Sequence, residues 1–339
     1  MFSDRPRLAL TLGDCAGIGP ELVLRALNDP GIRDACRLRV YGNLALLRRV
    51  AEAAAVPFPE RLAVVPQNAA APDDPSNDGH LLLDQPFAEA ATLTPGTVQA
   101  ACGARAYDWI RRAVADIQSG LADALVTAPV NKEALNLAGV RFPGHTEILA
   151  DLTRTPAPCM AFHAEKLFVS LATIHEAVSD VPGLLSLPSL TRTIRLTHEA
   201  CLRFGVPRPR LGVLALNPHA GEHGLFGKEE DAVIRPAIAL ARESGIDASG
   251  PLVPDTAFTW LVPGNPAPFD AYVAMYHDQA LIPFKMVAFD TGVNVTLGLP
   301  LVRTSPDHGT AFDLAWQGKA SPASLFSAIR LAADMARRA

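Results

Sequence analysis

Three short apolar runs of this chain each end close to a histidine. The runs and their histidines are 167–174 with His175, 211–216 with His219, and 271–276 with His277. Short apolar runs bounded by turn residues predict buried β-strands. Open α/β sheets place their ligands beyond the carboxyl ends of such strands. Three histidines in that position therefore indicate a functional site more readily than three unrelated core residues.

Apolar runs alternate with helical patterns along the rest of the chain as well. Expected strands cover residues 8–12, 37–41, 61–65 and 124–126; expected helices cover 44–55, 97–118, 189–204, 229–243 and the segment from about 322. Residues 67–80 and 250–258 are rich in Pro, Gly and Asp and are expected as loops. Strands that alternate with helices predict a largely parallel α/β sheet with helices on both faces.

The composition excludes several classes of protein. The chain of 339 residues is 49% apolar and 19% charged, with a formal net charge of −5, which argues against a general nucleic-acid binder. No run of about 18 apolar residues predicts a membrane span, and the first residues do not resemble a signal peptide. The five cysteines are scattered and show no CxxC spacing, so neither a disulfide framework nor a cysteine zinc site is expected. We therefore expect a cytoplasmic protein.

The three strand-end histidines match the ligand number of a catalytic metal site, which uses three protein ligands and keeps one position open. Their wide separation in sequence carries no specificity, so structural histidines remain an alternative. Lys285 and Arg303 have no acidic neighbour in sequence and predict either a clamp for phosphate or carboxylate or two solvated cations. Lys132 follows a strand and a proline, and is either a site residue or the first lysine of a helix.

Two aspartates lie in turn-rich segments. Asp14 and Asp255 are flanked by Gly or Pro, and side chains there often only cap turns. The glycine-rich segment 13–21 reads GDCAGIGPE, which is neither a phosphate-binding GK[ST] loop nor the GxGxxG of a Rossmann fold. A Rossmann domain is therefore not expected.

An ordered set of motifs runs from about residue 7 to residue 335. In chain order the motifs read TLGDCAGIGPE, TAPVNKEAL, GHTE, TIH, LNPHAGE, MYHDQALIPFK and GVNVTLGLPLVRTSPDHGTAFDLA. This set resembles the 4-hydroxythreonine-4-phosphate dehydrogenase family of pyridoxal phosphate biosynthesis. The resemblance implies an isocitrate/isopropylmalate dehydrogenase-like fold of two α/β domains with a cleft between them. The first domain would comprise 1–128 and 305–339, and the second, 129–304, would carry most substrate and metal residues.

The resemblance also implies roles for particular residues. A divalent metal (Zn, Mg or Co) would be held by His175, His219 and His277, and NAD or NADP would be bound by residues that stay unassigned. The substrate would be bound by His145, Thr146, Lys285, Asn294 and Arg303. Lys132, Asp255 and a hydroxide at the metal are the candidates for the general base. The enzyme would be a homodimer with a shared site, in which the residue matching His277 comes from the partner subunit.

The implied reaction is the oxidation of 4-phosphooxy-L-threonine to 2-amino-3-oxo-4-phosphooxybutanoate, which decarboxylates to 3-amino-2-oxopropyl phosphate. The chain departs from the family at Cys15, at Trp316 and Gln317, and in the loop AGEHGLFG, none of which is an implied ligand position. These departures leave two alternatives open. One is a related dehydrogenase for 4-phosphothreonate or an aromatic cis-dihydrodiol, and the other is a non-catalytic protein that binds a metal and a phosphometabolite.

Overall fold

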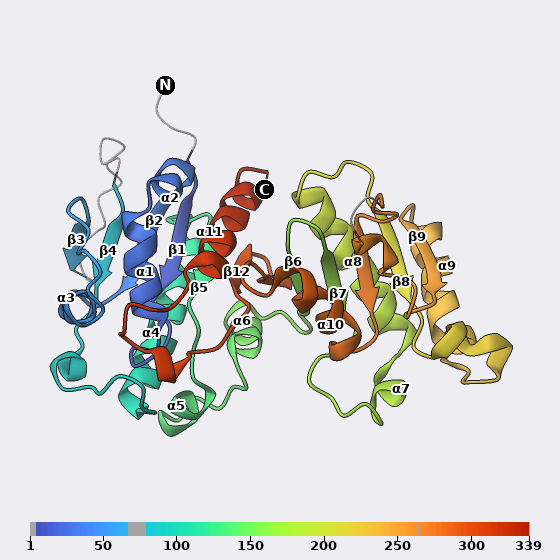
Figure 1. The fold of residues 1–339 in the computed structure, drawn as a ribbon, viewed down its shortest axis with the longest axis horizontal. Helices are drawn as coiled ribbons and strands as arrows, with labels where there is room; N and C mark the ends of the chain where they lie inside the picture. The colour runs from blue at the N-terminus through green and yellow to red at the C-terminus, as the bar shows by residue number, and fades with distance from the viewer. Residues whose placement is uncertain (1–4, 67–78, 263–264, 339) are drawn as a thin grey trace. The chain divides into compact units, whose positions relative to one another are not determined.

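The computed structural model of the chain describes residues 5–66, 79–262 and 265–338, so most of the expected loop 67–80 lies outside the described residues. The chain forms two compact units (Figure 1). One comprises Met1–Ala157 with Leu299–Arg337, and the other comprises Pro158–Gly298. The domain assignment expected from the sequence, 1–128 with 305–339 and 129–304, stays a prediction.

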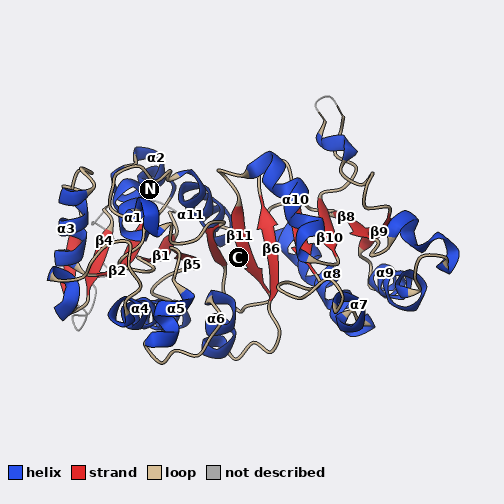
Figure 2. Ribbon diagram, turned by 60° about the horizontal axis from the view of Figure 1, so that its bottom comes forward, coloured by secondary structure: helices blue, strands red, loops and turns tan. Residues whose placement is uncertain are grey.

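The first unit is built on a parallel sheet with the strand order β3-β4-β2-β1-β5-β12. Its strands are β1 (Arg7–Thr11), β2 (Arg37–Gly42), β3 (Ala63–Pro66), β4 (Leu81–Asp84), β5 (Ala124–Thr127) and β12 (Arg303–Pro306). Its helices are α1 (Gly19–Asn28), α2 (Pro30–Ala35), α3 (Leu44–Ala53), η1 (Ala88–Ala91), α4 (Ala100–Gln118), α5 (Lys132–Leu137), α6 (His145–Thr153), η5 (Phe312–Leu314) and α11 (Ala323–Ala336). Figure 2 shows α1 and α11 on one face of this sheet and α4 and α5 on the other.

Local side-chain chemistry sets where several of these helices begin. Asp29 accepts a hydrogen bond from the backbone N–H of Ile32, and Asn43 accepts one from Leu46, so α2 and α3 start with capped N-termini. The helix expected from residue 97 begins only at Ala100. The amide of Gln99 donates to the carbonyl of Thr94 at 2.8 Å, which holds the preceding residues in a turn.

The second unit has the strand order β11-β6-β7-β10-β8-β9, in which β6 runs antiparallel to β11 and β7 while the other pairs are parallel. Its strands are β6 (Cys159–His163), β7 (Phe168–Leu171), β8 (Arg210–Leu214), β9 (Asp247–Leu252), β10 (Ala271–Ala274) and β11 (Val293–Leu297). Its helical segments are α7 (Val181–Leu184), α8 (Leu187–Arg203), η2 (Pro218–Gly224), η3 (Glu230–Ile234), α9 (Arg235–Glu243), η4 (Thr259–Leu261) and α10 (His277–Ala288). Phe284 of α10 packs into a core with Phe162, Val169 and Tyr272 of the sheet.

The structure differs from the predictions made from the sequence at two places in this unit. The expected loop 250–258 begins inside β9, whose pairing with β8 shifts register near Gly212. Strand β9 lies at the edge of the sheet, where a Gly-Pro pair is tolerated. That pair is why the sequence pattern predicted a loop here. The expected helix 229–243 starts with a wide turn, Glu230–Ile234, before α9. Pro236 lacks an N–H, and the wide turn accommodates the missing bond.

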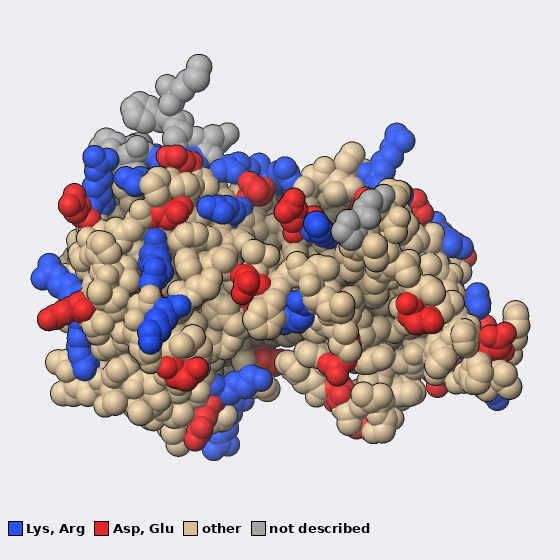
Figure 3. All heavy atoms as spheres, in the orientation of Figure 1, with Lys and Arg blue, Asp and Glu red and all other residues tan. Residues whose placement is uncertain are grey.

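On the face that Figure 3 shows, Lys and Arg are interspersed with Asp and Glu. Across the described ranges, no helix is both long enough and apolar enough to cross a membrane.

Candidate active site

The three strand-end histidines lie at one edge of the second unit's sheet. Strand β10 pairs in parallel with β7 on one side and with β8 on the other, so the carboxyl ends of these strands are neighbours. His175 follows β7, and His277 is the first residue of α10, which follows β10. Their imidazole centroids are 5.7 Å apart. The fold therefore brings these two histidines together within one chain.

His277 has a fixed partner for one ring nitrogen. Its Nδ1 lies 2.7 Å from Oδ1 of Asp278. Histidines that bind metals usually give one ring N–H to a carboxylate, which fixes the tautomer and leaves the other nitrogen for the metal. Nε2 of His277 is thus available as a ligand, and an imidazole nitrogen is a donor that a divalent cation such as zinc accepts.

His219 lies on a loop with an unusual backbone. Residues 219 to 223 all have positive φ, a conformation that L-residues rarely adopt in succession. The buried carboxylate of Glu230 holds the start of this loop, because its Oε1 accepts from the backbone N–H groups of Leu216 and Asn217 at 2.9 and 2.8 Å. A Cβ at Gly221 would meet Glu230 Oε2 at 2.7 Å, and the φ of +81° at this position also favours glycine.

The ring of His219 lies 6.2 Å from the ring of Phe226 in the same loop. Within the described part of the chain, no three His, Cys, Asp or Glu side chains are grouped closely enough to hold a metal ion. One chain therefore brings together His175 and His277 but does not by itself assemble all three predicted ligands.

The other predicted residues of this unit lie on α10, β11 and the turn after β9. Lys285 is on α10, and its Nζ is 5.5 Å from the centroid of the Phe289 ring. Asn294 is partly buried on β11, opposite Phe162 of β6. Asp255 is solvent-exposed in the turn that follows β9. The structure thus places Lys285 on the same helix as His277, two turns further along.

The remaining predicted residues gather in the first unit, around Arg303. This side chain is only 3% exposed, and its Nη2 donates to the hydroxyl of Thr127 at 2.8 Å. Burial lowers the pKa of Arg303 to about 9, although the charge of Glu147 opposes the shift. A buried guanidinium at the end of β5 is suited to binding an anionic group that replaces its lost hydration.

His145 and Thr146 form the first turn of α6, next to this arginine. Burial, and then the positive charge of Arg303, lower the pKa of His145 well below its usual value, so its imidazole is neutral. Its Nε2 is buried without a hydrogen-bond partner in the described structure. Gly144 precedes the helix and offers no side-chain cap. The N–H groups of this turn are thus open to an anion.

Lys132 is the exposed first residue of α5, where Asn131 caps the helix by accepting from Ala134 N–H at 2.8 Å. A Cβ placed on Gly144 would lie 3.9 Å from Cε of Lys132. The structure therefore brings Lys132 beside the start of α6, with His145 and Thr146. Asp255, the other candidate base, belongs to the second unit.

Sequence reasoning gave Asp14 no role beyond a turn cap, but its environment is unusual. Oδ1 accepts from the N–H of Ala16 at 2.8 Å, which is the expected cap. The residue is fully buried, and Oδ2 has no partner among the described residues. Burial raises the pKa of Asp14 to about 6, and the Ala16 hydrogen bond only partly offsets this. The signal in the sequence was its position directly after the first buried strand.

These features define a class: an α/β protein with two neighbouring histidines at one sheet edge of the second unit and a buried guanidinium in the first. Residues 34–332 match the family model described as pyridoxal phosphate biosynthetic protein PdxA. The chain belongs to this family, as the motifs had predicted.

Full-length relatives agree with this assignment. The chain is 46% identical to the 4-hydroxythreonine-4-phosphate dehydrogenase of Geobacter metallireducens, over 99% of this chain and 97% of the relative. It is 43% identical to the D-threonate 4-phosphate dehydrogenase of Salmonella typhimurium, over 97% and 98% of the two chains. The crystal structure of the Klebsiella pneumoniae 4-hydroxythreonine-4-phosphate dehydrogenase superimposes with a TM-score of 0.87 at 41% identity, covering 99% and 100% of the two chains.

The predicted α/β fold class is confirmed by this structural similarity. The prediction of an oxidoreductase of the 4-hydroxythreonine-4-phosphate dehydrogenase type, in pyridoxine biosynthesis, is confirmed as well. Membership of a dehydrogenase family implies a nicotinamide cofactor.

Proposed function

We propose that this chain oxidises 4-phosphooxy-L-threonine with NAD or NADP to 2-amino-3-oxo-4-phosphooxybutanoate, a β-keto acid that then loses carbon dioxide to give 3-amino-2-oxopropyl phosphate. The observation that carries the proposal is the 46% identity with the Geobacter metallireducens enzyme over 99% of this chain.

Anion recognition is assigned to the buried arginine and the helix start beside it. Arg303 supplies a planar donor fork, and the first turn of α6 supplies backbone N–H groups. The neutral imidazole of His145 and the hydroxyl of Thr146 are further, uncharged hydrogen-bond donors for the same anion. In the second unit, Lys285 and Asn294 are assigned to substrate binding. The phosphate or carboxylate of the substrate is the group that these side chains would hold and orient.

The histidines are assigned to a divalent metal, and Zn, Mg and Co are the candidates. When bound, the metal lowers the pKa of the substrate hydroxyl and the nicotinamide accepts the hydride. In this chain, Asp278 fixes the tautomer of His277. Lys132 and Asp255 are proposed to move the hydroxyl proton, and Lys132 is supported by its position beside His145.

The active unit is proposed to be a homodimer with a shared site. Ile282, Met286 and Phe289, spaced by four and three residues, are 62%, 80% and 74% exposed, and they form an apolar stripe along α10 and the residue that follows it. A second copy of the chain would cover this stripe, which begins five residues after His277 on the same helix. The ligands that one chain does not assemble would then come from two chains. The expectation that the partner supplies His277 competes with the 5.7 Å pairing of His175 and His277 in one chain.

A spectrophotometric assay tests the proposal. NADH or NADPH formation is followed with 4-phosphooxy-L-threonine, with D-threonate 4-phosphate and with unphosphorylated 4-hydroxythreonine, each with Zn, Mg or Co. We expect the highest kcat/KM for 4-phosphooxy-L-threonine. A higher kcat/KM for D-threonate 4-phosphate would indicate that the chain has the activity named for its Salmonella typhimurium relative. No turnover with any of them would favour the non-catalytic alternative.

A further inference from the structure

A cavity of the first unit lies at the amino-terminal edge of its sheet. The cavity has a volume of about 670 Å³, within the usual range of small-molecule sites. It is lined by Leu27, Asn28, Arg33, Pro57, Phe58, Pro59, Glu60, Arg61, Leu62, Ala63, Gly79 and His80. Leu62 and His80 directly precede β3 and β4, whereas Asp14 and Thr127 lie at the carboxyl ends of β1 and β5. A five-residue strand is about 16 Å long, so the two edges are well separated.

His80 is a buried polar group in the lining of this cavity. Its side chain is 5% exposed, and its Nδ1 accepts from the N–H of Leu38 at 3.1 Å. That bond places the ring proton on Nε2. This nitrogen is buried and has no partner in the described structure. Burial, and then the charges of Arg33 and Arg5, lower the pKa of His80 to about 4, so the ring is a neutral donor at physiological pH.

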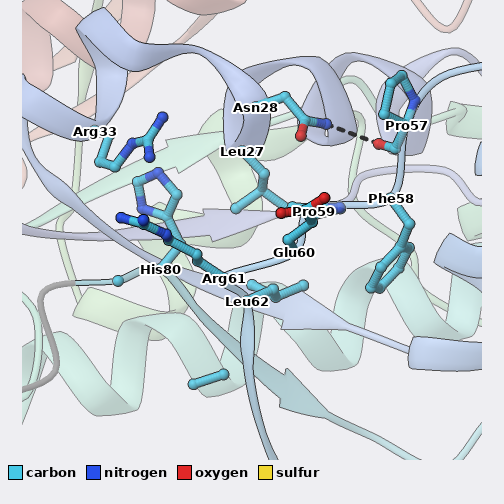
Figure 4. Close-up of a pocket in the computed structure, with 12 residues that line it drawn as sticks. Leu27, Asn28, Arg33, Pro57, Phe58, Pro59, Glu60, Arg61, Leu62 and His80 are labelled. Carbon is cyan, nitrogen blue, oxygen red and sulfur yellow. Dashed lines mark hydrogen bonds between the residues drawn. The ribbon is translucent and has the colours of Figure 1, made fainter.

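Two guanidinium groups accompany this donor. Figure 4 shows Arg33, Arg61 and His80 at the same end of the cavity. The backbone N–H of Ala63 donates to the carbonyl of His80 at 3.0 Å, which fixes the histidine further. Glu60 also lines the cavity, so its lining carries two cationic side chains and one anionic one. An unsatisfied N–H donor in a cavity lined by two guanidinium groups matches an anionic acceptor.

The other end of the cavity is apolar and braced. Figure 4 shows Phe58 away from the two arginines, with Asn28 Nδ2 hydrogen-bonded to the carbonyl of Pro57 at 2.8 Å. The guanidinium of Arg48 lies 5.7 Å from the Phe58 ring centroid. A braced aromatic wall opposite a cationic end matches a ligand with an apolar body and one anionic group.

We propose that this cavity binds a small organic anion, in which a phosphate or carboxylate contacts His80 Nε2, Arg33 and Arg61 and an apolar body lies against Phe58 and Leu62. The site is separate from the substrate site proposed around Arg303. It rests on the first unit alone and does not depend on the proposed catalytic function.

Phenyl phosphate, benzoate and inorganic phosphate are the probes, titrated into the full-length protein labelled with ¹³C at histidine. The His80 signal is identified by its loss in His80→Asn, whose amide oxygen can still accept from Leu38. We expect phenyl phosphate to shift this signal saturably, with a dissociation constant below about 1 mM. Benzoate tests whether a carboxylate serves as the anionic group, and inorganic phosphate tests whether the apolar wall contributes. Inorganic phosphate should bind several-fold more weakly than phenyl phosphate, and equal binding would contradict the organic ligand.

Matched arginine variants test the location. Arg33→Ala and Arg61→Ala each remove one charged donor, and Arg61 is an exposed side chain whose loss leaves the core intact. Each should weaken phenyl phosphate binding roughly tenfold or more. The control Arg208→Ala changes an exposed arginine of the second unit and should leave binding unchanged. Unchanged affinity in both Arg33→Ala and Arg61→Ala would overturn the site, as would loss of the His80 response in Arg303→Lys.

Discussion

Arg303 and Thr127 are 176 residues apart in sequence and share a hydrogen bond of 2.8 Å between Nη2 and Oγ1. They lie on the neighbouring parallel strands β12 and β5. The bond directs a buried guanidinium toward the carboxyl end of β5, where α6 begins with His145 close enough for its pKa to respond to the arginine. A strand-to-strand contact thus orients the proposed anion-binding group.

Replacing this arginine tests its role. Arg303→Lys keeps a positive charge but loses the planar fork, so we expect KM for the phosphorylated substrate to rise and kcat/KM to fall. A lost charged hydrogen bond is worth roughly 1.5–3 kcal/mol, or about tenfold to a hundredfold in kcat/KM. Steady-state kinetics measures this. Equal loss of kcat/KM for the unphosphorylated substrate would show that the arginine does not recognise the phosphate.

The three histidines are expected to be individually essential. His175→Ala, His219→Ala and His277→Ala should each lose metal-dependent turnover while keeping the far-UV spectrum and thermal transition of the parent. Metal content after dialysis gives the second readout. His198→Ala on α8 is the control and should keep both activity and metal. A His219→Ala enzyme with normal metal content and rate would remove that residue from the ligand set.

Asp278 is expected to act through His277. Asp278→Asn removes the carboxylate that fixes the Nδ1 proton, and loss of such a partner typically weakens metal binding about tenfold to a hundredfold. Competition with a chelator measures the affinity. Saturating metal should restore most of the rate in Asp278→Asn but not in His277→Ala. An unchanged metal affinity would show that the 2.7 Å contact between Asp278 and His277 plays no part in metal binding.

Mixing inactive variants shows which chain supplies each histidine. With random subunit exchange, half the dimers are mixed and half of their sites are repaired, so about a quarter of the activity returns where the two mutated ligands of one site come from different chains. If the partner supplies His277, His175→Ala complements His277→Ala but not His219→Ala.

If His175 and His277 act from one chain, as their 5.7 Å separation favours, His219→Ala complements both of the others, which do not complement each other. No recovery in any pair after proven exchange would contradict a shared site.

The raised pKa of Asp14 predicts that the stability of the folded protein depends on pH. Its folded-state pKa of about 6 lies above the ordinary 3.8, so the folded state favours the protonated form. The stabilisation is complete below about pH 4 and is lost as pH rises through 6. The shift of about two units corresponds to about 3 kcal/mol. Asn at position 14 cannot ionise. The free energy of unfolding of Asp14→Asn, relative to that of the parent, should therefore rise by about this amount between pH 4 and 7.5. Parallel denaturation profiles for the two proteins would rule out the shift.

The sequence by itself determined the α/β class, most strand positions and the strand-end histidines. These depend on local patterns: short apolar runs form buried strands, and whatever follows a strand must emerge at its carboxyl end. The motifs also determined the family, since they preserve side chains in order along the chain. Helix α10 was missed because Pro283 and a continuous apolar stretch conceal its period.

Tertiary structure alone decided which side chains meet. Strand order places β10 between β7 and β8 and so brings His277 to His175, which no spacing in the sequence reveals. Burial raises the pKa of Asp14, for which the sequence suggested only a turn cap. Burial also lowers the pKa of His80, so this residue of an expected loop is a neutral imidazole in the lining of a cavity. Desolvation and the charges of neighbouring side chains depend on what packs around a group, and packing joins residues that are far apart in the chain.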